Sequence, residues 1–257
     1  MISDFFEIFL LSIIQGVSEF IPVSSAAHLI LASNIYEFKN QSLLIDISLH
    51  LGSLLAILFY FKDDIFNFNK NKNKNLFYKI IIGTLPLIII GYFLYVTNII
   101  DYFRNIKVIA WATLFFGILL YIADKNKFLK KIDADFNMKS VLIIGFFQVL
   151  ALIPGVSRAG ITITAGRILG FNRTDSTKIS FYLSIPALLG ASTLGIKDLF
   201  KENIDFNLIV FIGVFLSFLF SLITIKIFLK FVKNFSLNVF VVYRIFLAMV
   251  LFYIIYF

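Results

Sequence analysis

The sequence has no cysteine and few charged residues. Among its 257 residues there is no Cys, which excludes disulfides, thiolate catalysis and Cys-ligated metals. Charged residues make up only 15% of the chain, whereas hydrophobic residues make up 60%. A soluble domain typically has about 25% charged and about 45–50% apolar residues. The composition therefore excludes an ordinary soluble domain and predicts an integral membrane protein.

Basic residues are also missing from positions 1–38. A secretory signal peptide opens with a positively charged region, so no cleavable signal is expected. Further along, Lys and Arg gather in short segments between apolar stretches, and they account for the net charge of +8. The positive-inside rule explains this distribution, so the charge does not indicate nucleic-acid binding.

Apolar residues form eight stretches. A helix needs about 20 residues to cross the hydrocarbon core of a membrane. Six stretches have about this length and are predicted to cross: 43–61, 77–97, 106–123, 179–196, 207–225 and 237–257. The other two, 5–31 and 140–169, are longer and are interrupted at Pro22 and Pro154.

The two interrupted stretches are predicted to form re-entrant hairpins, with a kinked crossing as the alternative. Proline removes a helical hydrogen bond, and broken backbone at membrane depth is tolerated only inside protein or beside a water-filled cavity. If 140–169 does not cross, 16 basic residues lie on one side of the membrane and 5 on the other; a crossing gives 12 against 9. The positive-inside rule favours the hairpin. We therefore expect an all-α polytopic membrane protein with about six transmembrane helices and two re-entrant helical hairpins.

The two interrupted stretches also resemble each other at an offset of 132 residues. The matches, which the offset aligns without a gap, are Ile21-Pro22 with Ile153-Pro154, Ser25 with Ser157, Ile47-Ser48 with Ile179-Ser180, and Leu51 with Leu183. They predict an internal repeat within a single membrane domain, with repeat 1 at about 1–125 and repeat 2 at about 135–257. Three crossings separate the hairpins, so the second copy is inverted and the two tips should meet near the midplane.

Polar residues concentrate at the first break: Gln15, Glu19, Ser24, Ser25 and His28. Ionisable groups at membrane depth are costly and therefore indicate function. A serine that follows the proline break is a natural N-cap. The half-helix that it begins would direct its N–H groups and the positive end of its dipole at an anion.

The second break contributes Ser157, Arg158 and Thr162, with Gly155 and Gly160 allowing close backbone approach. The planar guanidinium of Arg158 matches phosphate oxygens. A guanidinium, a carboxylate, hydroxyls and an imidazole together suit phosphoryl transfer, because they supply a cationic clamp, a nucleophile and an acid/base.

Two other polar residues are assigned structural roles. His50 follows Asp46 by four residues and is expected to pair with it. Arg244 lies in an apolar stretch with no motif around it, so a hydrogen bond to a backbone carbonyl or a carboxylate is expected.

The sequence resembles the undecaprenyl-diphosphate phosphatase family of the bacitracin-resistance type. The resemblance rests on QGVSEFIPVSSAAH at 15–28 and PGVSRAGIT at 154–162, with further similarity at 46–52 and 180–191. It implies hydrolysis of undecaprenyl diphosphate to undecaprenyl phosphate and inorganic phosphate, which recycles the lipid carrier for peptidoglycan synthesis and confers bacitracin resistance. It also implies a divalent cation, Mg²⁺ or Ca²⁺, and a site in the bacterial inner membrane that faces the periplasm.

Together, the resemblance and the residue chemistry suggest specific roles. Glu19 and Arg158 are expected to be catalytic, and Ser24, Ser157, Arg158 and Thr162 to bind the substrate. Glu19 and Gln15 are expected to hold the metal, although the family usually has a glutamate where Gln15 stands.

The nucleophile stays open at this point. Ser25 is the preferred nucleophile, with His28 as acid/base; the reverse assignment and direct attack by water are alternatives. A different function is also open, because an inverted repeat with broken helices is equally a transporter plan. That alternative is a secondary transporter or flippase of a polyprenyl-phosphate or another anionic substrate.

Overall fold

The computed structural model describes residues 2–36, 43–65, 71–125, 129–199 and 208–256. Within these ranges helices are the only regular elements, apart from an isolated β-bridge between Lys130 and Phe171. The predicted all-α class is therefore confirmed. In chain order the elements are α1 (Ile2–Ser18), α2 (Ser25–Tyr36), α3 (Leu43–Tyr60), α4 (Lys62–Ile65), α5 (Asn71–Val96), η1 (Ile99–Phe103), α6 (Ile106–Asp124), α7 (Ile132–Asp135), α8 (Met138–Val149), η2 (Leu150–Leu152), α9 (Arg158–Ile168), α10 (Arg173–Leu199), α11 (Leu208–Asn234) and α12 (Asn238–Tyr256).

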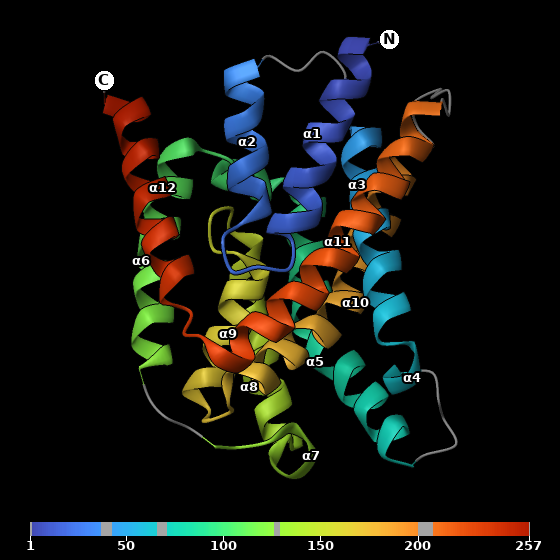
Figure 1. The fold of residues 1–257 in the computed structure, drawn as a ribbon, viewed down its shortest axis with the longest axis vertical. Helices are drawn as coiled ribbons and strands as arrows, with labels where there is room; N and C mark the ends of the chain where they lie inside the picture. The colour runs from blue at the N-terminus through green and yellow to red at the C-terminus, as the bar shows by residue number, and fades with distance from the viewer. Residues whose placement is uncertain (1, 37–42, 66–70, 126–128, 200–207, 257) are drawn as a thin grey trace.

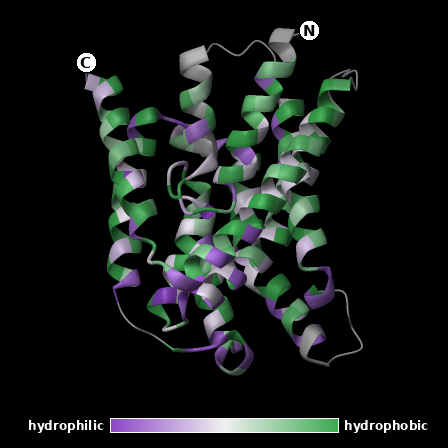
Figure 2. Ribbon diagram, in the orientation of Figure 1, coloured by the Kyte–Doolittle hydropathy of each residue, from purple (hydrophilic) through white to green (hydrophobic). Residues whose placement is uncertain are grey.

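Five helices are long and apolar enough to cross a membrane, namely α5, α6, α10, α11 and α12. The sixth expected crossing, α3, is also apolar, but its described part is shorter. Figure 2 shows hydrophobic residues along the peripheral helices and hydrophilic residues gathered in the interior and at the lower end. This pattern is that of a polytopic membrane protein whose polar groups face one another rather than lipid.

Both interrupted stretches form helical hairpins. In the first, α1 packs against α2, and the chain turns between Ser18 and Ser25 (Figure 1). In the second, α8 and η2 lead to a turn, and α9 returns alongside α8. The rings of Phe136 and Phe171 pack together, which places the start of α8 beside the end of α9. The two hairpins enter from opposite ends of the molecule, and their tips meet at mid-height.

The packing of the hairpins is reciprocal. The first arm of one hairpin, α1, lies on α11, whereas the first arm of the other, α8, lies on α5. The α5–α8 contact is close: a Cβ on Gly145 would lie 2.2 Å from the Gly83 carbonyl oxygen. This exchange of arms is what an inverted repeat predicts, and the repeat boundaries at about 1–125 and about 135–257 stay a prediction.

Helix α10 occupies the centre and supports both tips. In its most apolar segment, 61% of the residues are buried inside the protein, whereas the corresponding share for the peripheral α5 is 17%. Helix α10 packs on α3, α5, α9 and α11. The site described below therefore stands on a helix that is surrounded by protein.

Candidate active site

Each hairpin tip ends in a serine that caps the half-helix after it. The Ser24 hydroxyl accepts a hydrogen bond from Ala27 N at 3.4 Å, and the Ser157 hydroxyl accepts one from Gly160 N at 3.1 Å. Capping satisfies one of the free N–H groups at the start of a helix. The half-helices α2 and α9 therefore start at the tips and direct their N-terminal ends toward each other.

The structure corrects the predicted register between the two copies. The sequence comparison paired Ser25 with Ser157, but the structural equivalent of Ser157 is Ser24, since both are caps. Gly155, with φ +95°, is an extra residue in the second turn. The first helical residues, Ser25 and Arg158, are thus equivalent in position and different in chemistry.

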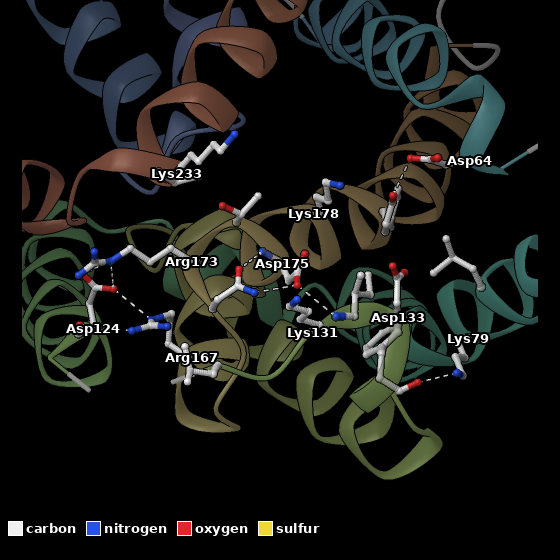
Figure 3. A pocket seen from close by; sticks show the side chains of 18 of the residues that line it. Asp64, Lys79, Asp124, Lys131, Asp133, Arg167, Arg173, Asp175, Lys178 and Lys233 are labelled. Carbon is white, nitrogen blue, oxygen red and sulfur yellow. Dashed lines mark hydrogen bonds and ion pairs between the residues drawn. The ribbon is translucent and has the colours of Figure 1, made fainter. Parts of the chain in front are cut away.

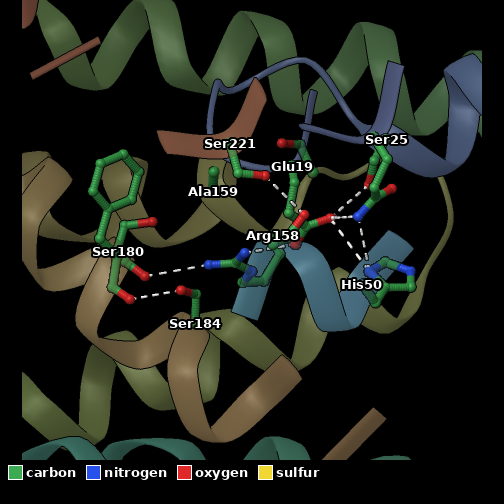
Figure 4. A network of polar contacts seen from close by, with 12 residues as sticks. Glu19, Ser25, His50, Arg158, Ala159, Ser180, Ser184 and Ser221 are labelled. Carbon is green, nitrogen blue, oxygen red and sulfur yellow. Dashed lines mark hydrogen bonds and ion pairs between the residues drawn. The ribbon is translucent and has the colours of Figure 1, made fainter. Parts of the chain in front are cut away.

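Glu19 lies between the two tips and is bound from both (Figure 4). One carboxylate oxygen, Oε1, accepts a hydrogen bond from Arg158 at 2.6 Å. The other, Oε2, accepts hydrogen bonds from the Ser25 hydroxyl at 3.1 Å and from Gln15 Nε2 at 3.0 Å. The side chains of Glu19 and Arg158 are only 7% and 12% exposed. The expectation that a guanidinium from one hairpin meets a carboxylate and a hydroxyl from the other is confirmed.

A small cavity opens at this cluster. Its volume is about 230 Å³, and its polar lining includes Glu19, Ser25, His50 and Arg158. The caps Ser24 and Ser157 line it as well. The rest of the wall is apolar and comes from α5, from the second hairpin and from α10: Leu87, Leu152, Ile153, Ala187, Leu188 and Ala191. The cavity therefore combines charged side chains from the two tips with walls that are mostly hydrocarbon.

The imidazole in the cavity wall belongs to His50 and not to His28. His50 Nδ1 lies 2.8 Å from Gln15 Nε2 and 3.9 Å from Glu19 Oε2. The sequence predicts only a structural role for His50 and does not predict that it lines the active-site cavity. A helical offset shows which residues of α3 share a face, but it does not show that this face meets α1.

His28 points away from the cavity toward α12. Its Nδ1 lies 2.6 Å from the Ser24 carbonyl oxygen and its Nε2 lies 2.6 Å from the Tyr243 hydroxyl. The two rings stack with centroids 5.6 Å apart. Both ring nitrogens are therefore occupied, and the predicted acid/base role of His28 requires it to leave Tyr243.

Thr162 also lies outside the cavity. It is fully buried, and its hydroxyl oxygen is 2.8 Å from the Arg158 carbonyl oxygen and 2.7 Å from the Ser180 hydroxyl. The predicted direct contact between Thr162 and a substrate is not available in this arrangement. Thr162 instead ties α9 to α10 next to the Ser180 carbonyl, which Arg158 also contacts at 3.3 Å.

The sequence matches a family model across nearly its whole length. Residues 8–250 match the model described as bacitracin resistance protein BacA. The chain belongs to the BacA family.

Three curated relatives that match along almost their whole length are each named undecaprenyl-diphosphatase. The chain is 54% identical to an undecaprenyl-diphosphatase of Pelagibacter ubique over 257 residues, which is 100% of both chains. It is 40% identical over 249 residues to an undecaprenyl-diphosphatase of Elusimicrobium minutum, covering 94% of this chain and 95% of the relative. A third relative of that name, from Alteromonas mediterranea, is 39% identical over 259 residues, with 96% and 97% covered. The BacA match includes both hairpin tips.

A metal ion fits this BacA site only with help from the substrate. Among the described residues, no group of three or more His, Asp or Glu side chains could hold a metal. However, Gln15 Oε1 is buried without a hydrogen-bond partner, beside the Glu19 carboxylate. Mg²⁺ is commonly held by one or two carboxylates together with phosphate oxygens and water. Glu19 and Gln15 therefore suit a Mg²⁺ ion whose other ligands come from a bound diphosphate.

Arg244 holds the second tip from behind. It is completely buried on α12, and it donates to the carbonyl oxygens of Gly155 at 2.9 Å and of Val156 at 3.0 Å. Its Nε donates to the Thr113 carbonyl oxygen at 3.2 Å. The expected bond to backbone carbonyls is confirmed, and it places a permanent positive charge directly behind the turn that presents Arg158.

Proposed function

We propose that the protein is an undecaprenyl-diphosphatase, which hydrolyses undecaprenyl diphosphate to undecaprenyl phosphate and inorganic phosphate. The observation that carries this function is the pairing of Arg158 and Glu19 across two hairpin tips, in a cavity whose other walls are mostly apolar. A lipid diphosphate likewise combines a charged head with a hydrocarbon tail. The undecaprenyl-diphosphatase name of the full-length relatives supports this reading. No feature of the site specifically favours the transporter alternative.

Substrate binding is proposed to break the ion pair. The diphosphate competes with Glu19 for the Arg158 guanidinium, whose planar donor fork suits phosphate oxygens. The hydroxyls of Ser24 and Ser157 each accept a capping bond, and their own protons stay available to donate to the diphosphate. The first N–H groups of α9 add further donors at the same tip.

Release from Arg158 prepares Glu19 to accept a proton. The Ser25 hydroxyl already donates to Glu19 Oε2. In the proposed step, Ser25 Oγ attacks the terminal phosphorus, its proton passes to Glu19, and the bond to the bridging oxygen breaks. Undecaprenyl phosphate leaves, and water then hydrolyses the phosphoserine to release inorganic phosphate. Arg158 stabilises the charge that develops on the phosphoryl oxygens.

A divalent cation, Mg²⁺ or Ca²⁺, belongs to the proposal as well. Glu19 and Gln15 would hold it, and it would supply charge neutralisation on the diphosphate. This cofactor rests on the donor chemistry of Glu19 and the unpartnered Gln15 oxygen.

The membrane is proposed to be the bacterial inner membrane, with the active site facing the periplasm. The second hairpin then enters from the cytoplasm, as the distribution of basic residues favours. The first hairpin enters from the periplasm, as expected for the other copy of an inverted repeat. In this orientation the protein regenerates undecaprenyl phosphate as the carrier lipid for peptidoglycan synthesis. Removal of the diphosphate form is then the proposed cause of bacitracin resistance.

The test is phosphate release from a C55 diphosphate by the purified protein in detergent, with and without a chelator. Arg158→Gln and Glu19→Gln should each lower kcat/KM by about 10²–10³, the usual cost of removing one group that stabilises transition-state charge. Arg158→Lys should retain part of the activity, because the positive charge stays. The exposed Lys139→Gln, on α8 outside the cavity, is the matched control and should behave as wild type.

The nucleophile is tested separately by rapid quench in denaturant at mildly alkaline pH, where both phosphoserine and the acid-labile phosphohistidine survive, followed by mass spectrometry. A phosphoryl group on Ser25 supports the proposed step, and one on His28 supports the reverse assignment. No phosphoryl enzyme in rapid-quench samples, with full activity in Ser25→Ala, would favour direct attack by water. Absence of phosphate release under all conditions would overturn the function itself.

A further inference from the structure

A second and larger cavity lies at the end of the protein opposite the two termini. Its volume is about 970 Å³ (Figure 3), and it opens where α4 and α7 lie in Figure 1. It shares no lining residue with the active-site cavity. Its lining comes from α4 and α7 and from those ends of α5, α6, α9, α10 and α11 that face the cytoplasm in the proposed orientation.

The lining of this cavity carries an excess of positive charge. Seven basic residues face four acidic residues: Lys79, Lys125, Lys131, Arg167, Arg173, Lys178 and Lys233 against Asp64, Asp124, Asp133 and Asp175. The difference, seven minus four, is three positive charges. A cavity of this kind attracts anions, because opposite charges interact more strongly beside a low-dielectric wall than in bulk water.

The carboxylates of the cavity are already engaged. Asp124 is bound by Arg167 at 3.0 Å and by Arg173 at 2.8 Å. Asp175 accepts a hydrogen bond from Asn172 Nδ2 at 2.8 Å, and Asp64 accepts one from the Tyr182 hydroxyl at 2.8 Å. These contacts hold the walls in place, and the carboxylates are already subtracted in the net excess of three positive charges.

Lys178 lies in the wall of this cavity without a polar partner among the described residues. It is half-buried on α10, and its ammonium group makes no hydrogen bond or ion pair with any residue that the structure describes. Figure 3 shows it in the middle of the cavity, between Asp64 and Asp175. The side chains of Lys131 and Lys233, at the rim, are exposed. The ammonium donors of Lys178 are therefore available to a ligand that enters the cavity.

We propose that this cavity binds a phosphate-bearing ligand, with Lys178 as its central contact. The ligand is either the phosphate head group of a membrane lipid or a free phosphate or diphosphate ion. Lysine is a common phosphate ligand because it offers a compact charge with three donors. Basic pockets between transmembrane helices on the cytoplasmic side are a known kind of site for lipid head groups. This proposal does not depend on the diphosphatase activity.

The experiment measures how fast each lysine reacts with an amine-acetylating reagent, read by mass spectrometry on the full-length protein in nanodiscs. One arm uses phosphatidylcholine nanodiscs with added inorganic pyrophosphate, at constant ionic strength and without divalent cations. The other arm uses nanodiscs that contain phosphatidic acid, whose head group is a phosphomonoester. Lys230, exposed on α11 and outside the cavity, is the internal control.

Selective protection of Lys178 supports the site. At a ligand concentration about ten times the Kd, the reactivity of Lys178 should fall about tenfold, since about nine-tenths of the protein is occupied. Protection by pyrophosphate in phosphatidylcholine identifies a free anion as sufficient, whereas protection only with phosphatidic acid identifies a lipid head group. Unchanged reactivity in both arms, or an equal fall at Lys178 and Lys230, would overturn the proposal.

A variant checks that Lys178 is the central contact. In the wild type, the ligand should also protect Lys233 at the rim, to a smaller extent than Lys178. In Lys178→Gln this protection should be lost, while the protein should elute from size-exclusion chromatography as wild type. Undiminished protection of Lys233 in Lys178→Gln would show that Lys178 is not the central contact.

Discussion

Ser24 and Ser157 share a rare backbone feature, a positive φ angle, of 82° and 69° respectively. Residues other than Gly, Asn and Asp seldom occur at positive φ, because the Cβ atom meets the following carbonyl oxygen. Both residues also cap a half-helix, so the two tips solve the same local problem in the same way. Strain of this kind persists where the surrounding structure enforces it, and it is often found at functional sites.

The left-handed turns decide where the next side chains point. Ser25 and Arg158 directly follow the two caps, and their side chains bind the two oxygens of one carboxylate, that of Glu19. One pseudo-equivalent position therefore supplies a hydroxyl in the first copy and a guanidinium in the second. The site combines two different chemical groups on a shared backbone geometry.

Replacement of a cap by alanine should destabilise the protein more than replacement by glycine. Ser157→Ala keeps the Cβ atom and its strain but loses the capping oxygen, so it should destabilise the protein by about 0.5–2 kcal/mol. Ser157→Gly loses the cap but removes a strain of about 1–2 kcal/mol, so its stability should stay close to that of wild type. Thermal unfolding in detergent measures both variants, with the same pair at Ser24 as a replicate. A lower Tm for glycine than for alanine would contradict the strained conformation.

The sequence was sufficient to predict the large features of the site. Prolines inside long apolar stretches predicted both hairpins, and an odd number of intervening crossings predicted that the tips would meet. The Arg158–Glu19 contact follows from these two steps, since few other charges lie at membrane depth. These features depend on backbone chemistry and the cost of buried charge, which a single sequence reveals.

Local register and side-chain direction could not be predicted in the same way. The extra residue at Gly155 shifts the structural equivalence by one, which identical residues on both sides of the break concealed. His28 shares a helical face with Ser24 and Ser25, yet its ring turns to Tyr243 on α12. Contacts between segments more than 200 residues apart depend on packing, which helical spacing does not encode.

Replacement of Tyr243 by phenylalanine should separate two roles for His28. The Tyr243 hydroxyl lies 2.6 Å from His28 Nε2, so it competes with any substrate contact of that nitrogen. Tyr243→Phe keeps the ring stacking and removes the competitor. If His28 acts after leaving Tyr243, kcat should rise, by up to about fivefold for a hydrogen bond that contributes about 1 kcal/mol.

The control for this variant is Tyr253→Phe, at an exposed tyrosine on the same helix. It should leave kcat unchanged. A fall in kcat for Tyr243→Phe alone would show instead that the tyrosine and histidine act as a unit.

A carboxylate at position 15 should strengthen the proposed metal site. Gln15 Oε1 is buried next to Glu19 and has no hydrogen-bond partner in the described part of the chain, so Gln15→Glu would offer two carboxylates to a cation. The Mg²⁺ concentration for half-maximal phosphate release should fall by about tenfold, which corresponds to about 1.4 kcal/mol of binding. Gln15→Leu, with no oxygen to offer, should raise that concentration. The same Mg²⁺ dependence in all three proteins would exclude Gln15 as a ligand.

The apolar part of the active-site cavity should select for the lipid tail. Ala187 lines the cavity on α10, so Ala187→Trp would fill space that the first isoprene units of the substrate need. If about two methylene groups lose their burial, KM for the C55 diphosphate should rise by about tenfold, at about 0.8 kcal/mol per methylene. A short, soluble diphosphate without an isoprenoid tail should keep its KM. Leu189→Trp, at an exposed position two residues along the same helix, is the matched control and should leave both KM values unchanged. An equal rise in KM for the long and the short substrate with Ala187→Trp would mean that the tryptophan blocks access of the diphosphate to the charged residues. Ala187 would then not be a contact of the lipid tail.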